Sequence, residues 1–444
     1  MDNSESADAA EPAEKKMKLD ENGELKSCKH YVKRKKRFCK MTVAKGKEYC
    51  GEHLSEAAEN LSETTPDRIP CPLDPKHSVY SKNLRKHLKI CNARPKEQPP
   101  YIVSGINLGE PVEDDPSDSW KLSEFSSEHV MDLIGRVEKV YKDEIEAKIT
   151  ESYLEHDILA EEVAKTEYGH ETMKHLIQTS SILGCLRDLG LLQPKTSFID
   201  FGSGKGQLSY WLARAIEGLD SANVVLLDRA SHRHKKDNKI EDKSFIHRIR
   251  ADIADFDVRK LDLLSEKQVV IVSKHLCGIA TDLALRCMVK GLMESQDTKA
   301  AQMKGFLIAL CCHHRCEWRS YVGKEEFLRN GFSRKDFNLL TKLVSWAVCG
   351  SGMSRERRKL MEESRVNEAE TNNEQNALGE GEIRNKISPE RRAEVGKMCK
   401  RLIDYCRLRF MEKNNFRTSL RYYVRNDVTL ENVCLIGQFV TVDQ

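Results

Sequence analysis

A strand-like run followed by three alternating glycines constrains this chain more than any other feature. Residues 198–209 read Phe-Ile-Asp-Phe-Gly-Ser-Gly-Lys-Gly-Gln-Leu-Ser, with Gly202, Gly204 and Gly206 at every second position. Residues 207–216 then follow a helical pattern of apolar positions. A strand, a glycine turn and a helix together form the element that holds an adenosine cofactor at the carboxyl edge of a parallel sheet. The sequence therefore predicts an α/β fold with a ligand at this turn.

Two features of the turn argue against a dinucleotide as the ligand. The glycines are spaced G-x-G-x-G, and Asp200 precedes the first of them by two residues, where a carboxylate would repel a pyrophosphate. That carboxylate suits the amino group of an amino-acid cofactor. Asp228 ends a second strand-like run (224–227), near where an acid accepts ribose hydroxyls, and Asp252 follows a third run (245–250), near the expected adenine. A NAD-type domain and a fold that binds nothing are the alternatives.

Together these residues resemble those of the class I S-adenosylmethionine-dependent methyltransferases. The resemblance implies a Rossmann-like sheet with S-adenosylmethionine as the cofactor. The residues that it assigns to cofactor binding are Asp200, Gly202, Gly204, Gly206, Asp228 and Asp252.

Composition limits the remaining possibilities. The chain has 444 residues, of which 39% are apolar and 32% charged, so we expect part of it to lie outside any packed core. The net charge of +3 gives no overall argument for nucleic acid. Without a bilayer-length apolar run or a secretory signal, we expect no membrane partner and a location in the cytoplasm, the nucleus or both. Fifteen cysteines are then expected as thiols and metal ligands rather than disulfides.

The amino-terminal cysteines and histidines have zinc-ligand spacing. One set follows the pattern C-x10-C-x10-C-x2-H and predicts a closed structural zinc site, with His30 as a rival ligand in a cramped position. A second set follows C-x5-H-x9-H-x3-C, with its last two ligands four residues apart on a predicted helix (81–90) and its first two in a proline-rich loop. Both segments are basic and carry aromatic residues, a combination that suits RNA, although protein docking is an alternative. The predicted ligands are Cys28, Cys39, Cys50 and His53, and Cys71, His77, His87 and Cys91.

Two polar runs follow buried-type strands at 269–273 and 306–310. Ligands in open α/β sheets bind beyond the carboxyl ends of the strands, so both runs are expected to line the active cleft. In the first run, His275 is a candidate base and Lys274 a candidate cation for a developing alkoxide. The alternative is that Lys274 pairs with the cofactor carboxylate and His275 orients a loop. For the second run (311–316, Cys-Cys-His-His-Arg-Cys), a third zinc site, a nucleophilic cysteine and a pocket wall all stay open.

The sequence also predicts the order of the domains. Helical periodicity covers 123–192, including 145–159, and 389–414, while strand-like runs at 419–424 and 434–442 are expected to form an antiparallel pair that closes the sheet. The predicted segments are a disordered acidic tail (1–24), a CCCH zinc module (25–54), a CHHC zinc finger (65–95), a linker (96–119), a first methyltransferase part (120–353), a mobile insertion (354–387) and a carboxyl-terminal methyltransferase part (388–444).

With the CCCH module, the CHHC finger and the Asp-Phe-Gly-Ser-Gly-Lys-Gly turn in one chain, the sequence closely resembles the eukaryotic tRNA 2′-O-methyltransferases that modify nucleotide 4 of the acceptor stem. The resemblance implies a tRNA substrate (for glycine, proline and in some organisms histidine) and ribose methylation from S-adenosylmethionine, with zinc in both modules. It leaves the protein partners unknown. An RNA base methyltransferase and a non-catalytic zinc-dependent RNA-binding protein are the alternative functions.

Overall fold

The chain forms two compact units, Met1–Gln98 and Pro99–Gln444. The computed structural model describes residues 27–32, 37–43, 48–50, 53, 68–94, 98–233, 235–292, 301–347 and 387–440. The predicted acidic tail, and the predicted insertion apart from Ile387, lie outside the described residues.

The described residues of the amino-terminal unit form short hairpins and an α-helix. Its elements are β1 (Tyr31–Val32), β2 (Arg37–Phe38), β3 (Arg68–Cys71), β4 (Asp74–Tyr80) and α2 (Leu84–Ile90). β1 pairs with β2 and β3 with β4, both antiparallel. Cys71 and His77 lie on the second hairpin rather than on the predicted loop. Ile69 and Val79 form an apolar cross-strand pair that stabilises this hairpin, whereas the nearby prolines had suggested a loop.

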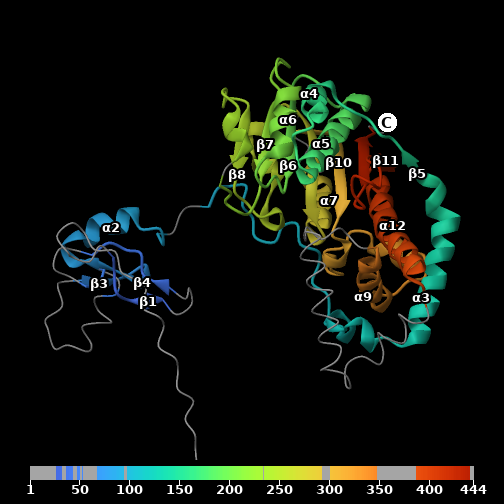
Figure 1. The fold of residues 1–444 in the computed structure, drawn as a ribbon, viewed down its shortest axis with the longest axis horizontal. Helices are drawn as coiled ribbons and strands as arrows, with labels where there is room; N and C mark the ends of the chain where they lie inside the picture. The colour runs from blue at the N-terminus through green and yellow to red at the C-terminus, as the bar shows by residue number, and fades with distance from the viewer. Residues whose placement is uncertain are drawn as a thin grey trace, which may run out of the picture. The chain divides into compact units, whose positions relative to one another are not determined.

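An eight-stranded sheet organises the second unit, in the order β5-β11-β12-β10-β9-β6-β7-β8 (Figure 1). The strands are β5 (Ile149–Glu151), β6 (Thr196–Phe201), β7 (Asn223–Leu227), β8 (Ile246–Ile249), β9 (Gln268–Cys277), β10 (Gln302–Cys311), β11 (Phe416–Tyr422) and β12 (Val433–Phe439). Strands β6 to β10 are parallel to one another, whereas β12 is antiparallel to both β10 and β11. This arrangement confirms the predicted α/β sheet with its closing antiparallel pair. The chain order reverses between β6 and β9, which is where such sheets bind ligands.

Helices cover both faces of this sheet, which explains why the central strands read as continuous apolar runs. Helices α5 (His170–Asp188) and α6 (Gln207–Ala215) pack on one face, and α7 (Ile279–Leu292) and α12 (Pro389–Lys413) pack on the other. The other α-helices among the described residues of this unit are α3 (Ser127–Val140), α4 (Ala160–Ala164), α8 (Lys324–Arg329) and α9 (Arg334–Leu343). Helices α3, α8 and α9 share a second apolar cluster with α12. Among the described residues, no helix has the length and apolarity that crossing a bilayer requires.

Part of the predicted helical region is a strand. Residues 149–151 form β5, which pairs in parallel with β11 at the edge of the sheet. Apolar spacing near Ile149 suggested a helix, but the prediction is wrong here because pairing with a strand more than 250 residues away decides the conformation.

The segment predicted as a linker is attached to the rest of the second unit from Tyr101 onward. The side-chain amide of Asn107, which is 2% exposed, donates hydrogen bonds to the carbonyls of Ile253 (2.6 Å) and Phe256 (2.8 Å). The backbone amide of Gly105 donates to Asp255 Oδ1 at 2.7 Å. A polar, proline-containing segment is therefore ordered by hydrogen bonds together with the packing of Tyr101, Ile102 and Leu108 on the core, and composition does not reveal either contribution.

Candidate active site and zinc sites

The glycine turn joins β6 to α6 as the sequence predicts. Its glycines have φ values of +68°, +54° and +74°, in the left-handed region that favours glycine. A Cβ on Gly206 would lie 2.7 Å from Asp237 Oδ1 and 2.8 Å from Arg248 Nη2. These two groups form an ion pair at 2.7 Å, and Arg248 also donates to the carbonyl of Gly204 at 3.0 Å. The third glycine therefore makes room for the ion pair that ties the turn to β8.

Asp228 and Asp252 follow the neighbouring strands β7 and β8. Asp228 Oδ2 accepts a hydrogen bond from the backbone amide of Gly204 at 2.8 Å, and its Oδ1 accepts one from Ala230 at 2.7 Å. Asp252 Oδ1 accepts from the amide of Ala254 at 3.0 Å, and its side chain is 41% exposed. Each carboxylate is thus held by backbone amides at the carboxyl edge of the sheet and keeps lone pairs for a ligand.

Both acids line one cavity of about 1060 Å³. Gly202 and the apolar side chains of Leu227, Ala251 and Ile253 line the same part of it. Apolar walls with two fixed carboxylates fit an adenosine group, which needs a flat apolar slot and acceptors for its ribose hydroxyls. The volume is at the upper end for a small-molecule site, so space remains beyond the cofactor.

Asp200 and Lys274 lie away from this cavity. Alternate residues of a strand face opposite sides of the sheet, and both side chains lie on the face that α5 and α6 cover. Ser209 on α6 donates to Asp200, while Lys274 Nζ donates to the carbonyl of His175 (3.2 Å) and to Thr179 Oγ1 (3.3 Å) on α5. Neither residue lines the cavity.

Burial dominates the ionisation of this pair. It raises the pKa of Asp200 to about 7, against the opposing effects of Ser209 and Lys274. It lowers the pKa of Lys274 to about 7, with Asp200 opposing the shift. Because Lys274 is 6% exposed and already bonded to α5, its position favours a structural contact with that helix over contact with a substrate. The side chain of His275 lies outside the described residues, so its predicted catalytic role stays a prediction.

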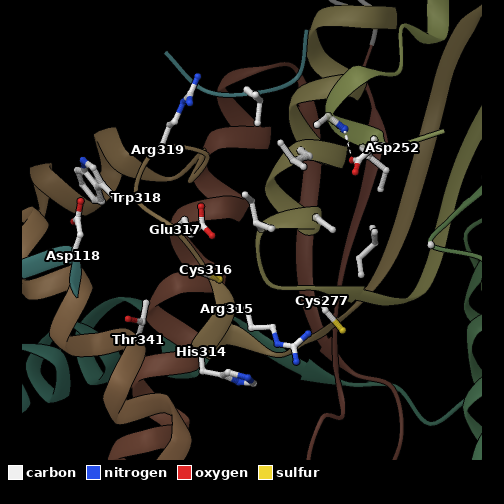
Figure 2. Close-up of a pocket in the computed structure, with 18 of the residues that line it drawn as sticks. Asp118, Asp252, Cys277, His314, Arg315, Cys316, Glu317, Trp318, Arg319 and Thr341 are labelled. Carbon is white, nitrogen blue, oxygen red and sulfur yellow. Dashed lines mark hydrogen bonds between the residues drawn. The ribbon is translucent and has the colours of Figure 1, made fainter. Parts of the chain in front are cut away.

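The two polar runs meet at the cavity. Leu276 and Cys277 line it from the end of β9, and His314, Arg315 and Cys316 line it from the turn after β10. Figure 2 shows the side chain of Arg315 extending toward Cys277, with Asp252 farther along the cavity. The sequence therefore located this wall correctly.

Sequence reasoning missed the next part of the wall. Trp318, Arg319, Arg334 and Lys342 also line the cavity. The cluster Arg-Cys-Glu-Trp-Arg, directly after a strand end, was the signal that could have identified its beginning. No such signal in the sequence pointed to the two basic residues that α9 contributes, which are Arg334 and Lys342.

A buried ionic network fixes the turn at 312–316 from behind. His313 Nε2 and Asp404 Oδ1 lie 2.7 Å apart, and both side chains are fully buried. Arg407 donates to Asp282 Oδ2 at 2.6 Å and to Cys316 Sγ at 3.1 Å. Burial alone would raise the pKa of Asp404, but His313 and neighbouring arginines outweigh it and lower that pKa. The turn therefore directs His313 inward, while His314 and Arg315 line the cavity.

In the CCCH module, the four predicted ligands converge. The ligand atoms of Cys28, Cys39, Cys50 and His53 all lie within 4.8 Å of one another. His53 Nδ1 lies 3.5 Å from Cys28 Sγ and 3.3 Å from Cys50 Sγ. The rival ligand His30 instead stacks on His53, with ring centroids 3.8 Å apart. Buried cysteines form the centre of this module, which fits a segment that needs a metal to fold.

The CHHC ligands converge in the same way. The ligand atoms of Cys71, His77, His87 and Cys91 lie within 4.8 Å of one another, and the two sulfurs are 3.8 Å apart. His77 Nδ1 lies 3.6 Å from Asp74 Oδ2, a carboxylate placed to orient a ligand histidine from behind. Both clusters have the donor types and number of closed structural zinc sites.

The fold and the site define a Rossmann-like methyltransferase with amino-terminal zinc-binding modules. The profile described as "Methyltransferase TRM13" matches residues 177–438, "CCCH zinc finger in TRM13 protein" matches 26–54, and "U11-48K-like CHHC zinc finger" matches 68–92. The chain belongs to the TRM13 methyltransferase family. It is a methyltransferase, and its two finger modules are zinc-binding.

Curated relatives share nearly the whole length of the chain. The "tRNA:m(4)X modification enzyme TRM13 homolog" of Mus musculus is 35% identical over 452 residues, covering 92% of this chain and 93% of that protein. The "tRNA:m(4)X modification enzyme TRM13" of Saccharomyces cerevisiae is 31% identical over 473 residues, with 92% and 95% covered. The solved plantazolicin methyltransferase BpumL in complex with SAH aligns at 14% identity with a TM-score of 0.22, over 48% of this chain and 70% of that one. That likeness is too distant to support a conclusion.

Proposed function

We propose that this methyltransferase modifies the ribose 2′-oxygen of nucleotide 4 in the acceptor stem of tRNAs for glycine, proline and, in some organisms, histidine. The names of its relatives, which describe tRNA:m(4)X modification enzymes, support tRNA as the substrate. The ribose position and the tRNA set come from the resemblance of the combined motifs. The chemistry of the cavity is compatible with an RNA substrate and with methylation of a ribose hydroxyl.

One observation carries the proposal: a single cavity joins the cofactor acids to a basic wall. Asp228 and Asp252 line it at the sheet edge, while Arg315, Arg319 and Lys342 line its other part. The guanidinium and ammonium groups suit the phosphates that flank a target nucleotide. A duplex acceptor stem exposes its 2′-hydroxyls in a shallow minor groove, where shape and phosphate contacts dominate recognition.

The amino-terminal unit adds a surface of the kind that binds RNA. Tyr80 on the CHHC module is 40% exposed, and the Arg68 guanidinium lies 4.7 Å from its ring centroid. Lys82 Nζ lies 5.9 Å from the same centroid. An aromatic face beside two cations supports base stacking together with phosphate contact.

We assign roles to the residues of the cavity as follows. Asp228 and Asp252 hold the ribose and adenine of the cofactor, and Arg315 holds a substrate phosphate. Bound S-adenosylmethionine supplies an electrophilic methyl group that a positioned hydroxyl accepts directly. His275, next in sequence to Lys274 near the end of β9, is the proposed base for the hydroxyl proton. Lys274 and Asp200 are positioning residues, because Asp200 is bonded to α6, the helix that follows the glycine turn, and Lys274 is bonded to α5 on the same face of the sheet.

The decisive experiment compares two otherwise identical tRNA transcripts. One has ribose at nucleotide 4 and the other has 2′-deoxyribose there. With purified full-length protein and labelled S-adenosylmethionine, we expect methylation of the first transcript alone, mapped to nucleotide 4 by mass spectrometry. Equal labelling of both transcripts would contradict ribose methylation and support the base methyltransferase instead.

A pair of variants separates the two ends of the cavity. Asp252→Asn should weaken S-adenosylmethionine binding, measured by calorimetry, because it removes the carboxylate at the cofactor wall. Arg315→Met should leave that binding intact and raise the KM for tRNA. Loss of cofactor binding in both variants would show that the cavity is not divided as proposed.

We also propose a cytoplasmic or nuclear location, because the composition is rich in cysteines that are expected to stay reduced there.

A further inference from the structure

Three cysteines gather at the carboxyl ends of β9 and β10, outside both zinc modules. The sulfurs of Cys277, Cys311 and Cys312 all lie within 4.8 Å of one another. Cys277 and Cys311 are opposite each other in the parallel pair β9–β10, and their sulfurs are 3.7 Å apart. All three residues are half-buried, and Cys277 lines the cavity.

The sulfur separation matches metal coordination rather than a disulfide. Two sulfurs in a disulfide are about 2.05 Å apart. Two thiolates bound tetrahedrally to one zinc at about 2.3 Å each lie about 3.8 Å apart. The CHHC module provides an internal standard, since its Cys71 and Cys91 sulfurs are 3.8 Å apart. The β9–β10 pair, at 3.7 Å, has the same spacing.

The backbone explains how two consecutive cysteines reach one point. In an extended strand, Cys311 and Cys312 would face opposite sides of the sheet. Cys312 instead has a φ of +52°, a left-handed conformation that costs about 1–2 kcal/mol for a residue other than glycine. This turn ends the alternation, so both sulfurs approach Cys277.

The other metal-binding side chains of the same run have different partners. His313 pairs with Asp404, and Cys316 accepts from Arg407. Neither belongs to the three-sulfur cluster. The ligand set therefore differs from the one that sequence order suggests, because Cys277 comes from the neighbouring strand.

We propose that Cys277, Cys311 and Cys312 bind a third zinc ion at the edge of the active cavity. Three thiolates are soft ligands that select zinc over hard cations such as magnesium. Within the described part of the chain, no fourth cysteine, histidine or carboxylate joins the group. Three protein ligands with one open position is the count found in zinc sites that keep a bound water. The ion ties together the two strand ends that form this wall.

Zinc content measured by inductively coupled plasma mass spectrometry tests the proposal. Full-length protein, purified under reducing conditions and desalted, should contain about three zinc ions per chain, one more than the two closed finger sites hold. Cys277→Ser and Cys311→Ser should each contain one ion fewer. Cys316→Ser is the matched control, since this cysteine lies in the same run but outside the cluster, and it should keep all the zinc.

Wild-type protein that contains only the zinc of the fingers overturns the proposal. Unchanged zinc in Cys277→Ser, or an equal loss in Cys316→Ser, overturns the ligand assignment. If the variants do not fold, alkylation of the wild type gives an independent answer. The three half-buried thiols should resist iodoacetamide until a chelator removes one zinc ion, and modification before chelation overturns the site. None of these measurements depends on the identity of the RNA substrate.

Discussion

Two alanine substitutions in the glycine turn distinguish backbone strain from the need for space. Gly206→Ala places a left-handed alanine, which costs about 1–2 kcal/mol. Its Cβ would also lie within 3.0 Å of Asp237, Arg248 and Leu226, and such overpacking adds about 1–3 kcal/mol. The sum is about 2–5 kcal/mol, which lowers Tm by about 4–10 °C at about 2 °C per kcal/mol in a domain of this size.

Gly204→Ala is the matched control. Its φ is +54°, but an added Cβ would meet no atom within 4 Å. Only the conformational cost applies, so Tm should fall by about 2–4 °C. All four tryptophans of the chain lie after residue 98, so thermal unfolding followed by tryptophan fluorescence reports on the catalytic unit alone. Equal Tm losses in the two variants would refute the claim that the Asp237–Arg248 pair needs the space at Gly206.

Three further outcomes are expected. Arg407→Met leaves the buried Asp282 carboxylate without its guanidinium partner and removes one of the cations beside Asp404, so the unfolding free energy from urea titration should fall by about 3–5 kcal/mol; a loss below about 1 kcal/mol would contradict the role of this network. Chelation of zinc should open the amino-terminal unit, because cysteines form the centre of its first module; limited proteolysis with mass spectrometry should then show new cuts within residues 27–94, and an unchanged pattern there would argue against structural zinc. The third outcome concerns pH. Burial raises the pKa of Asp200 from its ordinary value of 3.8 to about 7. Between these two values the folded state binds more protons than the unfolded state, so the unfolding free energy falls as the pH rises. Asp200→Asn should remove this loss of unfolding free energy, which is on the order of a few kcal/mol. Urea unfolding of the wild type and the variant at pH 5 and pH 7.5 measures it, and an equal change with pH in both proteins would contradict the prediction.

Much of the fold was predictable because its central strands are buried on both faces. Continuous apolar runs, such as Val224–Leu227, have few other interpretations when glycine turns and helical patterns separate them. The antiparallel pair β11–β12 and the helix α12 followed from the same periodicities. Strand β5 was not predictable, because it depends on a non-local pairing with β11. The attachment of residues 101–107 was missed because it rests on non-local contacts, which are the hydrogen bonds of Asn107 and the packing of Tyr101 and Ile102 on the core.

The sequence predicted at which strand end each site residue lies, but not which face of the sheet its side chain is on. The sequence correctly placed Asp228, Asp252 and the turn after β10 at one edge of the sheet. It did not indicate which side of the sheet Asp200 and Lys274 face, because that depends on the register and on a bulge within β9. Nor did it join Cys277 to Cys311, since a contact between parallel strands leaves no local signature.

In the turn at 312–316, neighbouring residues have different roles: some anchor the turn in the protein interior and others line the cavity. His313 and Cys316 hold it from within through Asp404 and Arg407, so these positions tolerate few alternatives. His314 and Arg315 project into the cavity and are not needed for that anchorage. Exchange of these two side chains should therefore be a permissive route by which an enzyme of this design adjusts which nucleic acid it accepts, while its scaffold stays the same.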